Sequence, residues 1–124
     1  MNVVDSSAWL SWFADDANAD RFAPAIEDTG HLLVPSITLT EVFKAVYRQR
    51  GESDALVAVA HMRQGRVVPL DDHLAIAAAQ YGATLKLPLA DSIIYATARA
   101  NSAEVWTQDA DFEGLEGVHY FPKA

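Results

Sequence analysis

Short apolar runs alternate with longer helical stretches along the whole chain, and this alternation constrains the fold more than any other feature. Apolar runs predict strands over residues 2–4, 32–35, 67–70, 104–107 and 118–121. Helical periodicity is found over about residues 8–13, 17–28, 37–50, 56–62, 73–81 and 89–101, with a loop predicted over 82–88. Strands that alternate with helices favour a parallel sheet covered on both faces. We therefore expect an α/β fold, a three-layer α/β/α sandwich around a mainly parallel sheet of about five strands.

Length and composition place the chain among single-domain globular proteins. Its 124 residues are 51% hydrophobic and 21% charged, so we expect one domain over residues 1–124 with a substantial core. The absence of cysteine excludes a disulfide framework, thiol chemistry and zinc sites built on cysteine. The chain does not open with a basic segment followed by an apolar run, so we predict no signal peptide. Its apolar runs are all shorter than the roughly 18 residues that a membrane span needs. We expect a cytoplasmic protein with no membrane partner.

The net charge is the first feature that bears on function. Seventeen Asp and Glu against nine Lys and Arg give a formal charge of -8. A protein that grips phosphates by bulk charge is usually basic, so simple electrostatic binding of nucleic acid is disfavoured. The acidity has two open interpretations. It is either an ordinary solvated surface or, in part, a group of carboxylates gathered to hold a divalent metal.

Four acids fall where a parallel sheet would bring them together. Asp5 ends the first predicted strand, Asp109 follows the fourth, Asp91 lies in the first turn of its helix, and Glu41 lies early in the helix after the second strand. In open α/β sheets, ligands bind outside the carboxyl ends of the strands. Carboxylates crowded there would repel one another unless a hard cation such as Mg²⁺ joined them. The chemistry implied is metal-assisted hydrolysis of a phosphodiester.

Each acid also has a purely structural interpretation. Asp5 and Asp91 are well placed as a helix cap and as a favourable first-turn acid, and Glu41 has the position of a surface residue. Asp109 and Asp111 form an Asp-x-Asp pair that is typical of a cap. If the loop has a different register, Asp111 takes the place of Asp109 as the fourth acid.

Four segments resemble the motifs of PIN domains, especially those of VapC-type toxins. They are residues 3–8 (VVDSSA), 40–42 (TEV), 87–98 (LPLADSIIYATA) and 107–112 (TQDADF), and their order and spacing cover essentially the whole chain. The resemblance implies an endoribonuclease that depends on Mg²⁺ or Mn²⁺, with Asp5, Glu41, Asp91 and Asp109 as the catalytic and metal-binding acids. It also implies Ser6 and Thr107 as hydrogen-bond partners of the carboxylates, a VapB-type antitoxin partner and a homodimer.

The resemblance is incomplete at the last motif, and the cations are few. Many relatives carry Arg or Lys where this chain has Gln108, which removes one cation that would meet an RNA phosphate. Lys44 and Arg48 share a helix face with Glu41. They either position an RNA phosphate beside the metal or pair with Glu41 within the helix.

The first predicted helix concentrates large apolar side chains within five residues: Trp9, Leu10, Trp12 and Phe13. They either pack in the core or leave an apolar patch for a partner protein. In the family that the chain resembles, this region contributes to the antitoxin groove.

Two other functional classes compete with an RNA-cleaving toxin. A phospho-accepting receiver-like domain has similar length and alternation, but it needs an acid pair after the first strand, where this chain has Asp5 followed by two serines. It also needs a lysine near the last strands, and none lies between Lys86 and Lys123. A binding module that no longer cleaves is the third possibility, against which the presence of all four acids argues.

Overall fold

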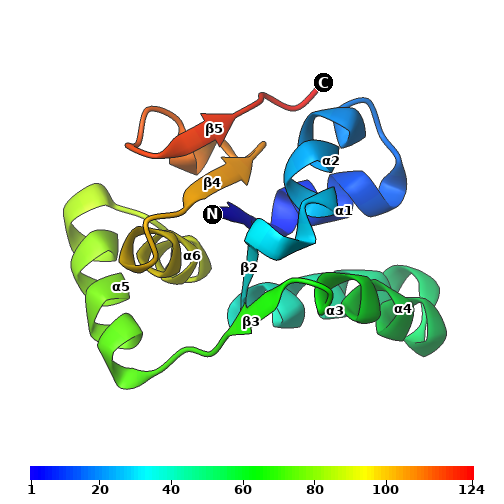
Figure 1. Ribbon diagram of the computed structural model, residues 1–124, viewed down its shortest axis with the longest axis horizontal. Coiled ribbons are helices and arrows are strands. Elements are labelled where there is room, and N and C mark those ends of the chain that lie inside the picture. Colours follow the sequence, from blue (N-terminus) through cyan, green and yellow to red (C-terminus); the bar gives the residue numbers. More distant parts are fainter.

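Five short strands form one sheet in which every neighbouring pair is parallel. The computed structural model describes residues 1–124 and gives the strand order β3-β2-β1-β4-β5 (Figure 1). On the central strand, Val3 pairs with Leu33 on one side and with Val105 on the other. The strands are β1 (Asn2–Val4), β2 (Leu32–Pro35), β3 (Arg66–Val68), β4 (Glu104–Thr107) and β5 (Val118–Tyr120). The predicted parallel sheet of about five strands is confirmed.

Helices connect the strands and cover both faces of the sheet (Figure 1). They are α1 (Ser6–Ala14), α2 (Ala19–Glu27), α3 (Ser36–Arg50), α4 (Glu52–Met62), α5 (Asp72–Leu85) and α6 (Leu89–Ala100), with 3₁₀ turns η1 (Thr29–His31) and η2 (Ala110–Phe112). None of the helices is long and apolar enough to cross a membrane.

Alternating side chains of the strands build two separate cores. Val4, Leu32 and Val34 point to one face, where they pack with residues of α1, α2, α3 and α4. Val3 and Leu33 point to the other face, where they pack with residues of α6 and with Phe112 of η2. A third, smaller cluster joins α5 to α6, so α5 lies outside α6. The side chains on the two faces of the sheet therefore pack against different helices, which gives three layers with the sheet in the middle.

β3 lies at an edge of the sheet, because it pairs only with β2. The strand ends at Val68, directly before Pro69, whose missing N–H cannot serve a sheet ladder.

The structural interpretation of Asp5 as a helix cap is confirmed. α1 begins at Ser6, and the Asp5 side chain accepts a hydrogen bond from the backbone N–H of Ala8. An acid at this position satisfies one of the free N–H groups of the first turn.

The predicted loop over residues 82–88 was also wrong over its first half, since α5 continues to Leu85. A Cβ on Gly82 would lie 3.0 Å from the Ser92 hydroxyl, so glycine allows α5 and α6 to approach closely. The helix ends at Lys86, which adopts a left-handed conformation with φ of 57°. The close packing of α5 against α6 at Gly82 therefore outweighs the tendency of glycine to end a helix.

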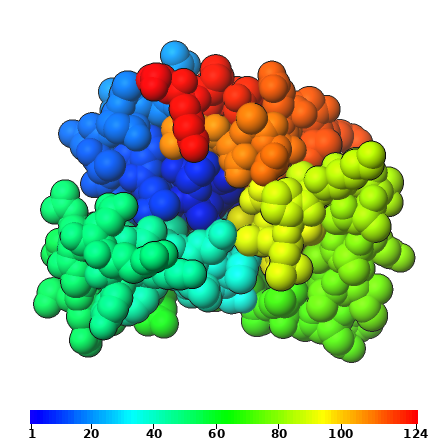
Figure 2. Space-filling model, turned by 180° about the vertical axis from the view of Figure 1, so that it is seen from behind, coloured from blue at the N-terminus to red at the C-terminus, as the bar shows by residue number.

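The apolar residues of α1 pack in the core or against its edge. Trp9 is fully buried in the core, whereas Leu10, Trp12 and Phe13 are half-buried and pack against its edge. Leu10 and Phe13 also line a groove of about 490 Å³ that is completed by residues of α3 and α4. Figure 2 shows that the surface is hollowed elsewhere too, between the α3–α4 pair and the α5–α6 pair.

Candidate metal centre

Asp5 lies at the carboxyl end of the central strand and is held there by several hydrogen bonds. Its Oδ1 accepts from the Ala8 N–H at 3.0 Å and from the Ser7 hydroxyl at 2.8 Å. Its Oδ2 accepts from the Thr107 hydroxyl at 2.8 Å. The side chain is almost completely buried. Burial raises the pKa of Asp5 to about 6, with the Asp109 charge adding to the rise and the hydrogen bonds opposing it.

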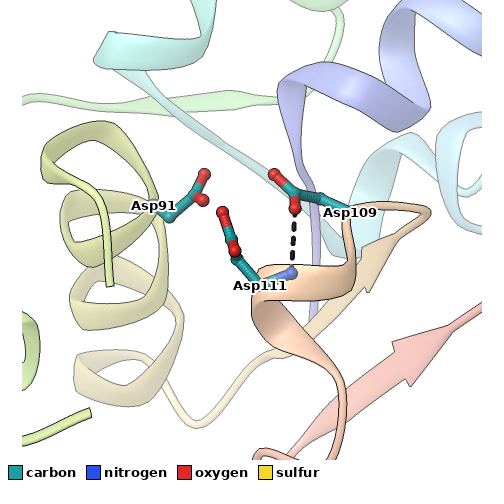
Figure 3. A group of neighbouring side chains, drawn as sticks. All are labelled: Asp91, Asp109 and Asp111. Atoms are coloured by element: carbon teal, nitrogen blue, oxygen red, sulfur yellow. Dashed lines mark hydrogen bonds between the residues drawn. The ribbon is translucent and has the colours of Figure 1, made fainter. Parts of the chain in front are cut away.

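Asp91, Asp109 and Asp111 bring their carboxylates together near this point. One oxygen from each lies within 4.8 Å of the other two. In Figure 3, Asp91 projects from the first turn of α6, and its carboxylate faces those of Asp109 and Asp111, which come from the segment after β4. Three carboxylates at this separation form a concentrated negative site.

The crowding changes the protonation of Asp91 most. Burial, followed by the charges of Asp109, Asp5 and Asp111 and a hydrogen bond to Asp111, together raise the pKa of Asp91 to about 8. Because both Asp5 and Asp109 influence Asp91, all four aspartates belong to one electrostatic group. In the absence of a cation, Asp91 holds a proton at neutral pH.

The sequence left open whether Asp109 or Asp111 is the fourth acid, and the structure brings both to Asp91. Asp109 caps the short η2 turn, because its Oδ1 accepts from the backbone N–H of Asp111 at 2.9 Å (Figure 3). The turn directs the two side chains toward the same point. Asp109 is half-buried and Asp111 is exposed. The capping interpretation and the metal-binding interpretation of this pair are therefore compatible.

Glu41 is the acid that the structure keeps apart from this group. It is half-buried on α3, and its Oε1 accepts a hydrogen bond from the Ser6 hydroxyl at 2.6 Å. Its carboxylate, like that of Asp5, is not among the three that lie within 4.8 Å of one another, but unlike Asp5 it is also not among the charges that raise the pKa of Asp91. Ser6 directly follows Asp5, so the bond ties α3 to the start of α1 beside the cluster.

The Thr107 hydroxyl and the Gln108 amide organise the strand ends around the acids. Thr107 Oγ1 donates to Asp5 and accepts from the Asp109 N–H at 2.8 Å. The Gln108 side chain points away from the acids: it donates to the Ser7 carbonyl and accepts from the Asn18 amide at 3.0 Å. Gln108 thus joins the last motif to the first and to the turn before α2.

Sequence reasoning missed the contact of Ser7 with Asp5 and the joint presence of Asp109 and Asp111. Ser6 was expected to hydrogen-bond a carboxylate of the acidic set, and it does so by donating to Glu41, whereas Ser7 donates to Asp5. The cap position of Asp5 would have indicated the Ser7 contact, because a side chain two residues after the cap can turn back to it.

The two cations near Glu41 on α3 are free of it. Lys44 and Arg48 are both exposed, and neither forms an ion pair with Glu41. The predicted alternative of a pair within the helix is therefore wrong, and both cations are available at the surface.

The donor set fits a hard divalent cation. It consists of carboxylate oxygens from Asp91, Asp109 and Asp111, with Asp5 close enough to influence the charge of both Asp91 and Asp109. Mg²⁺ and Mn²⁺ prefer oxygen ligands, and neither histidine nor sulfur is present in the group. A cation here would offset the repulsion that keeps Asp91 protonated.

Comparison with known families and structures gives one family and a set of similar folds. The family model described as the PIN domain matches residues 3–118. No curated protein sequence gives a significant match.

Three of the similar solved structures are titled as a toxin–antitoxin complex, a toxin and a DNA-bound VapBC. A chain of a toxin–antitoxin complex from Klebsiella pneumoniae is 22% identical, with a TM-score of 0.83 over 99% of this chain and 100% of that one. Mycobacterium tuberculosis VapC20, titled a sarcin–ricin loop cleaving toxin, is 21% identical, with a TM-score of 0.80 over 98% of this chain and 100% of that one. DNA-bound VapBC from Salmonella typhimurium is 20% identical, with a TM-score of 0.74 over 98% of each chain. At these identities the similarity establishes the fold.

Proposed function

The chain belongs to the PIN domain family, and from that premise we propose that it is the toxin of a toxin–antitoxin pair, a divalent-metal-dependent endoribonuclease. The single observation that carries the proposal is the convergence of Asp91, Asp109 and Asp111 beside the buried Asp5. These acids come from two strand ends and one helix start, and no requirement of folding calls for such repulsion. A bound cation would offset the repulsion and so account for the convergence of these acids.

The acids divide into two roles. Asp5, Asp91 and Asp109, with Asp111 beside them, would hold Mg²⁺ or Mn²⁺. When bound, the cation lowers the pKa of water and stabilises negative charge on the phosphate oxygens. Hydrogen bonds from Thr107 and Ser7 orient the Asp5 carboxylate and keep it a good ligand.

Glu41 is better placed to handle a proton than to share a ligand position. It stands outside the close group, held by the Ser6 hydroxyl at 2.6 Å. We assign it as the base that orients the attacking water and accepts its proton as oxygen adds to phosphorus and the bond to the leaving ribose oxygen breaks. The leaving oxygen takes its proton from solvent.

The substrate needs local positive charge, because the chain as a whole carries -8. Lys44 and Arg48 supply it on α3, on the helix face of Glu41 and without acidic partners. They would contact RNA phosphates on the strand that leaves the metal centre. Gln108 adds no cation, because its amide is already engaged with Ser7 and Asn18.

We also propose that the protein works in the cytoplasm with a VapB-type antitoxin and as a homodimer. The similar structures from Klebsiella pneumoniae and Salmonella typhimurium are a toxin–antitoxin complex and DNA-bound VapBC, which supports a partner of this class. The groove of about 490 Å³ beside Leu10 and Phe13 supports a peptide-binding surface on this side of the chain. The receiver-like alternative has no support, since Asp5 is followed in sequence by two serines and no lysine lies between Lys86 and Lys123.

The test is single-turnover cleavage of RNA with Mg²⁺ or Mn²⁺ by the wild type, Asp91→Asn and Asp20→Asn. Asp20 is exposed on α2, so Asp20→Asn removes the same charge at a distance from the cluster. We expect cleavage by the wild type and by Asp20→Asn, and a loss of at least about a hundredfold for Asp91→Asn.

Equal rates for the wild type and Asp91→Asn would refute the assignment. A wild type that binds metal but cleaves no RNA would instead indicate the non-cleaving binding module.

A further inference from the structure

One face of α6 contacts the segment after β4 at three successive turns. Asp91, Tyr95 and Arg99 are spaced by four residues, which places them along one side of the helix. Asp91 faces Asp109 and Asp111. Farther along the helix, Tyr95 and Arg99 face the loop that connects η2 to β5. The contacts beyond Asp91 belong to no part of the proposed reaction.

Tyr95 fixes this loop from within the core. Its side chain is only 4% exposed, and its hydroxyl donates to the Glu116 carbonyl at 2.8 Å. Its ring packs edge-on against Tyr81 at 5.1 Å and lies 6.5 Å from the ring of Phe112. Phe112 is fully buried and directly follows Asp111 in η2. A shift of the loop would therefore break this partly buried hydrogen bond and disturb the packing of Phe112.

Arg99 provides a second, weaker attachment at the far end of the loop. Its guanidinium lies 3.4 Å from the Glu116 carboxylate, but the Glu116 side chain is 84% exposed, so water screens the pair. Gly117 has a φ of 75°, and a Cβ there would lie 2.7 Å from the Arg99 guanidinium. The loop thus passes close to α6 at a position that favours glycine.

The attachment opposes a force that the metal centre itself creates. Once Asp91 is deprotonated, its carboxylate repels those of Asp109 and Asp111, and that repulsion would push η2 away from the helix. Burial also raises the pKa of Tyr95, so its hydroxyl stays protonated and remains a donor throughout the neutral range.

We propose that Tyr95 is a positioning residue for the metal centre: through Glu116 and Phe112 it holds the 109–117 segment against α6, so that Asp109 and Asp111 face Asp91 before a cation arrives. The inference rests on the proposed function for the identity of the cation as Mg²⁺ or Mn²⁺. It requires that loss of one hydroxyl, more than 20 residues from its acceptor in sequence but close to it in the fold, weakens metal binding.

The test is Mn²⁺ titration calorimetry on the full chain, comparing the wild type, Tyr95→Phe and Tyr81→Phe. Tyr81→Phe is the matched control, because the Tyr81 ring contacts Tyr95 but its hydroxyl has no hydrogen-bond partner in the protein. We expect Tyr95→Phe to weaken Mn²⁺ binding about tenfold, as is typical of residues that support metal ligands, and Tyr81→Phe to leave it unchanged. Measurements are made well below the melting temperature of each variant.

Hydrogen exchange on the metal-free proteins separates positioning from general destabilisation. The N–H groups of Asp111 and Phe112 are bonded to Asp109, and in Tyr95→Phe they should exchange faster, whereas those of β1 should not. Uniformly faster exchange, or unchanged Mn²⁺ affinity, would overturn the inference. If Tyr95→Phe does not fold, Arg99→Gln takes its place, with a smaller expected loss of about two- to threefold because its ion pair is exposed.

The failures of the two proposals are distinguishable. If the wild type binds no Mn²⁺, the proposed function is refuted. If the wild type and Tyr95→Phe bind Mn²⁺ with the same affinity, only the proposed role of Tyr95 is refuted.

Discussion

Thr107 donates a hydrogen bond to the carboxylate of Asp5 at 2.8 Å, across 102 positions of sequence. Both residues end parallel, neighbouring strands, and their bond joins the carboxyl edges of β1 and β4. The same hydroxyl accepts from the Asp109 N–H. One small side chain therefore sets the relative positions of two acids of the candidate metal centre.

Replacing Thr107 by Val should destabilise the protein and weaken its metal site. The substitution keeps the shape but leaves the buried Asp5 carboxylate and the Asp109 N–H each without one partner. We expect a loss of about 1–3 kcal/mol in the free energy of unfolding, measured by urea denaturation. Thr97→Val is the control: Thr97 is equally buried, but it bonds only to a carbonyl of its own helix. An equal loss of Mn²⁺ affinity in the two variants would contradict the positioning role of Thr107.

The free energy of unfolding of the metal-free protein should fall as the pH rises from about 4 to about 8. Asp91 has a pKa of about 8 in the folded chain and an ordinary value of 3.8 when unfolded. Between those values the folded state binds more protons than the unfolded state, so raising the pH favours unfolding. Asp5, with a pKa of about 6, contributes to the lower part of the same range.

Urea denaturation in EDTA at several pH values measures this slope. Asp91→Asn should flatten it, and saturating Mn²⁺ should reverse it, because the metal binds the deprotonated acids. A wild-type slope identical to that of Asp91→Asn would show that Asp91 titrates normally.

Asp109→Asn should lower Mn²⁺ affinity more than Asp111→Asn does. The Asp109 charge acts on both Asp5 and Asp91, whereas that of Asp111 acts on Asp91, and Asp111 is the more exposed of the two. The comparison is fair because asparagine retains an oxygen that can cap η2. We expect at least a tenfold difference by calorimetry. The reverse order would make Asp111 the principal fourth acid.

Glu41→Gln should lower the rate of RNA cleavage while leaving Mn²⁺ affinity within about threefold of the wild type. The residue stands outside the close carboxylate group, and glutamine can still accept the Ser6 hydroxyl bond but cannot take a proton. We expect a fall of about a hundredfold or more in the single-turnover rate at saturating metal. A large loss of Mn²⁺ affinity would show that Glu41 is a metal ligand instead.

The fold and the meeting of distant acids were accessible from the sequence because both follow from one regularity. Strands that alternate with helices must run parallel, and parallel strands end at one edge, so Asp5 and the pair after β4 had to approach each other. The position of Asp91 followed from the helix start after Pro88.

Details that depend on packing between helices and strands could not be predicted from the sequence. Gly82 reads locally as a helix stop, and only the closeness of Ser92 explains why α5 continues through it. Tyr95 sits in an apolar helical pattern that indicates core packing, and nothing local reveals that its hydroxyl meets Glu116. The motif indicated that Ser6 bonds a carboxylate, but not that the acceptor is Glu41 or that Ser7 bonds Asp5.

The central position of β1 has a consequence for synthesis of the protein. β1 is synthesised before its neighbour β4 and before the acids that follow β4. A nascent chain that still lacks Asp109 and Asp111 holds only part of the acidic group, so a metal centre built on these acids could not assemble until β4 and the turn after it had been made.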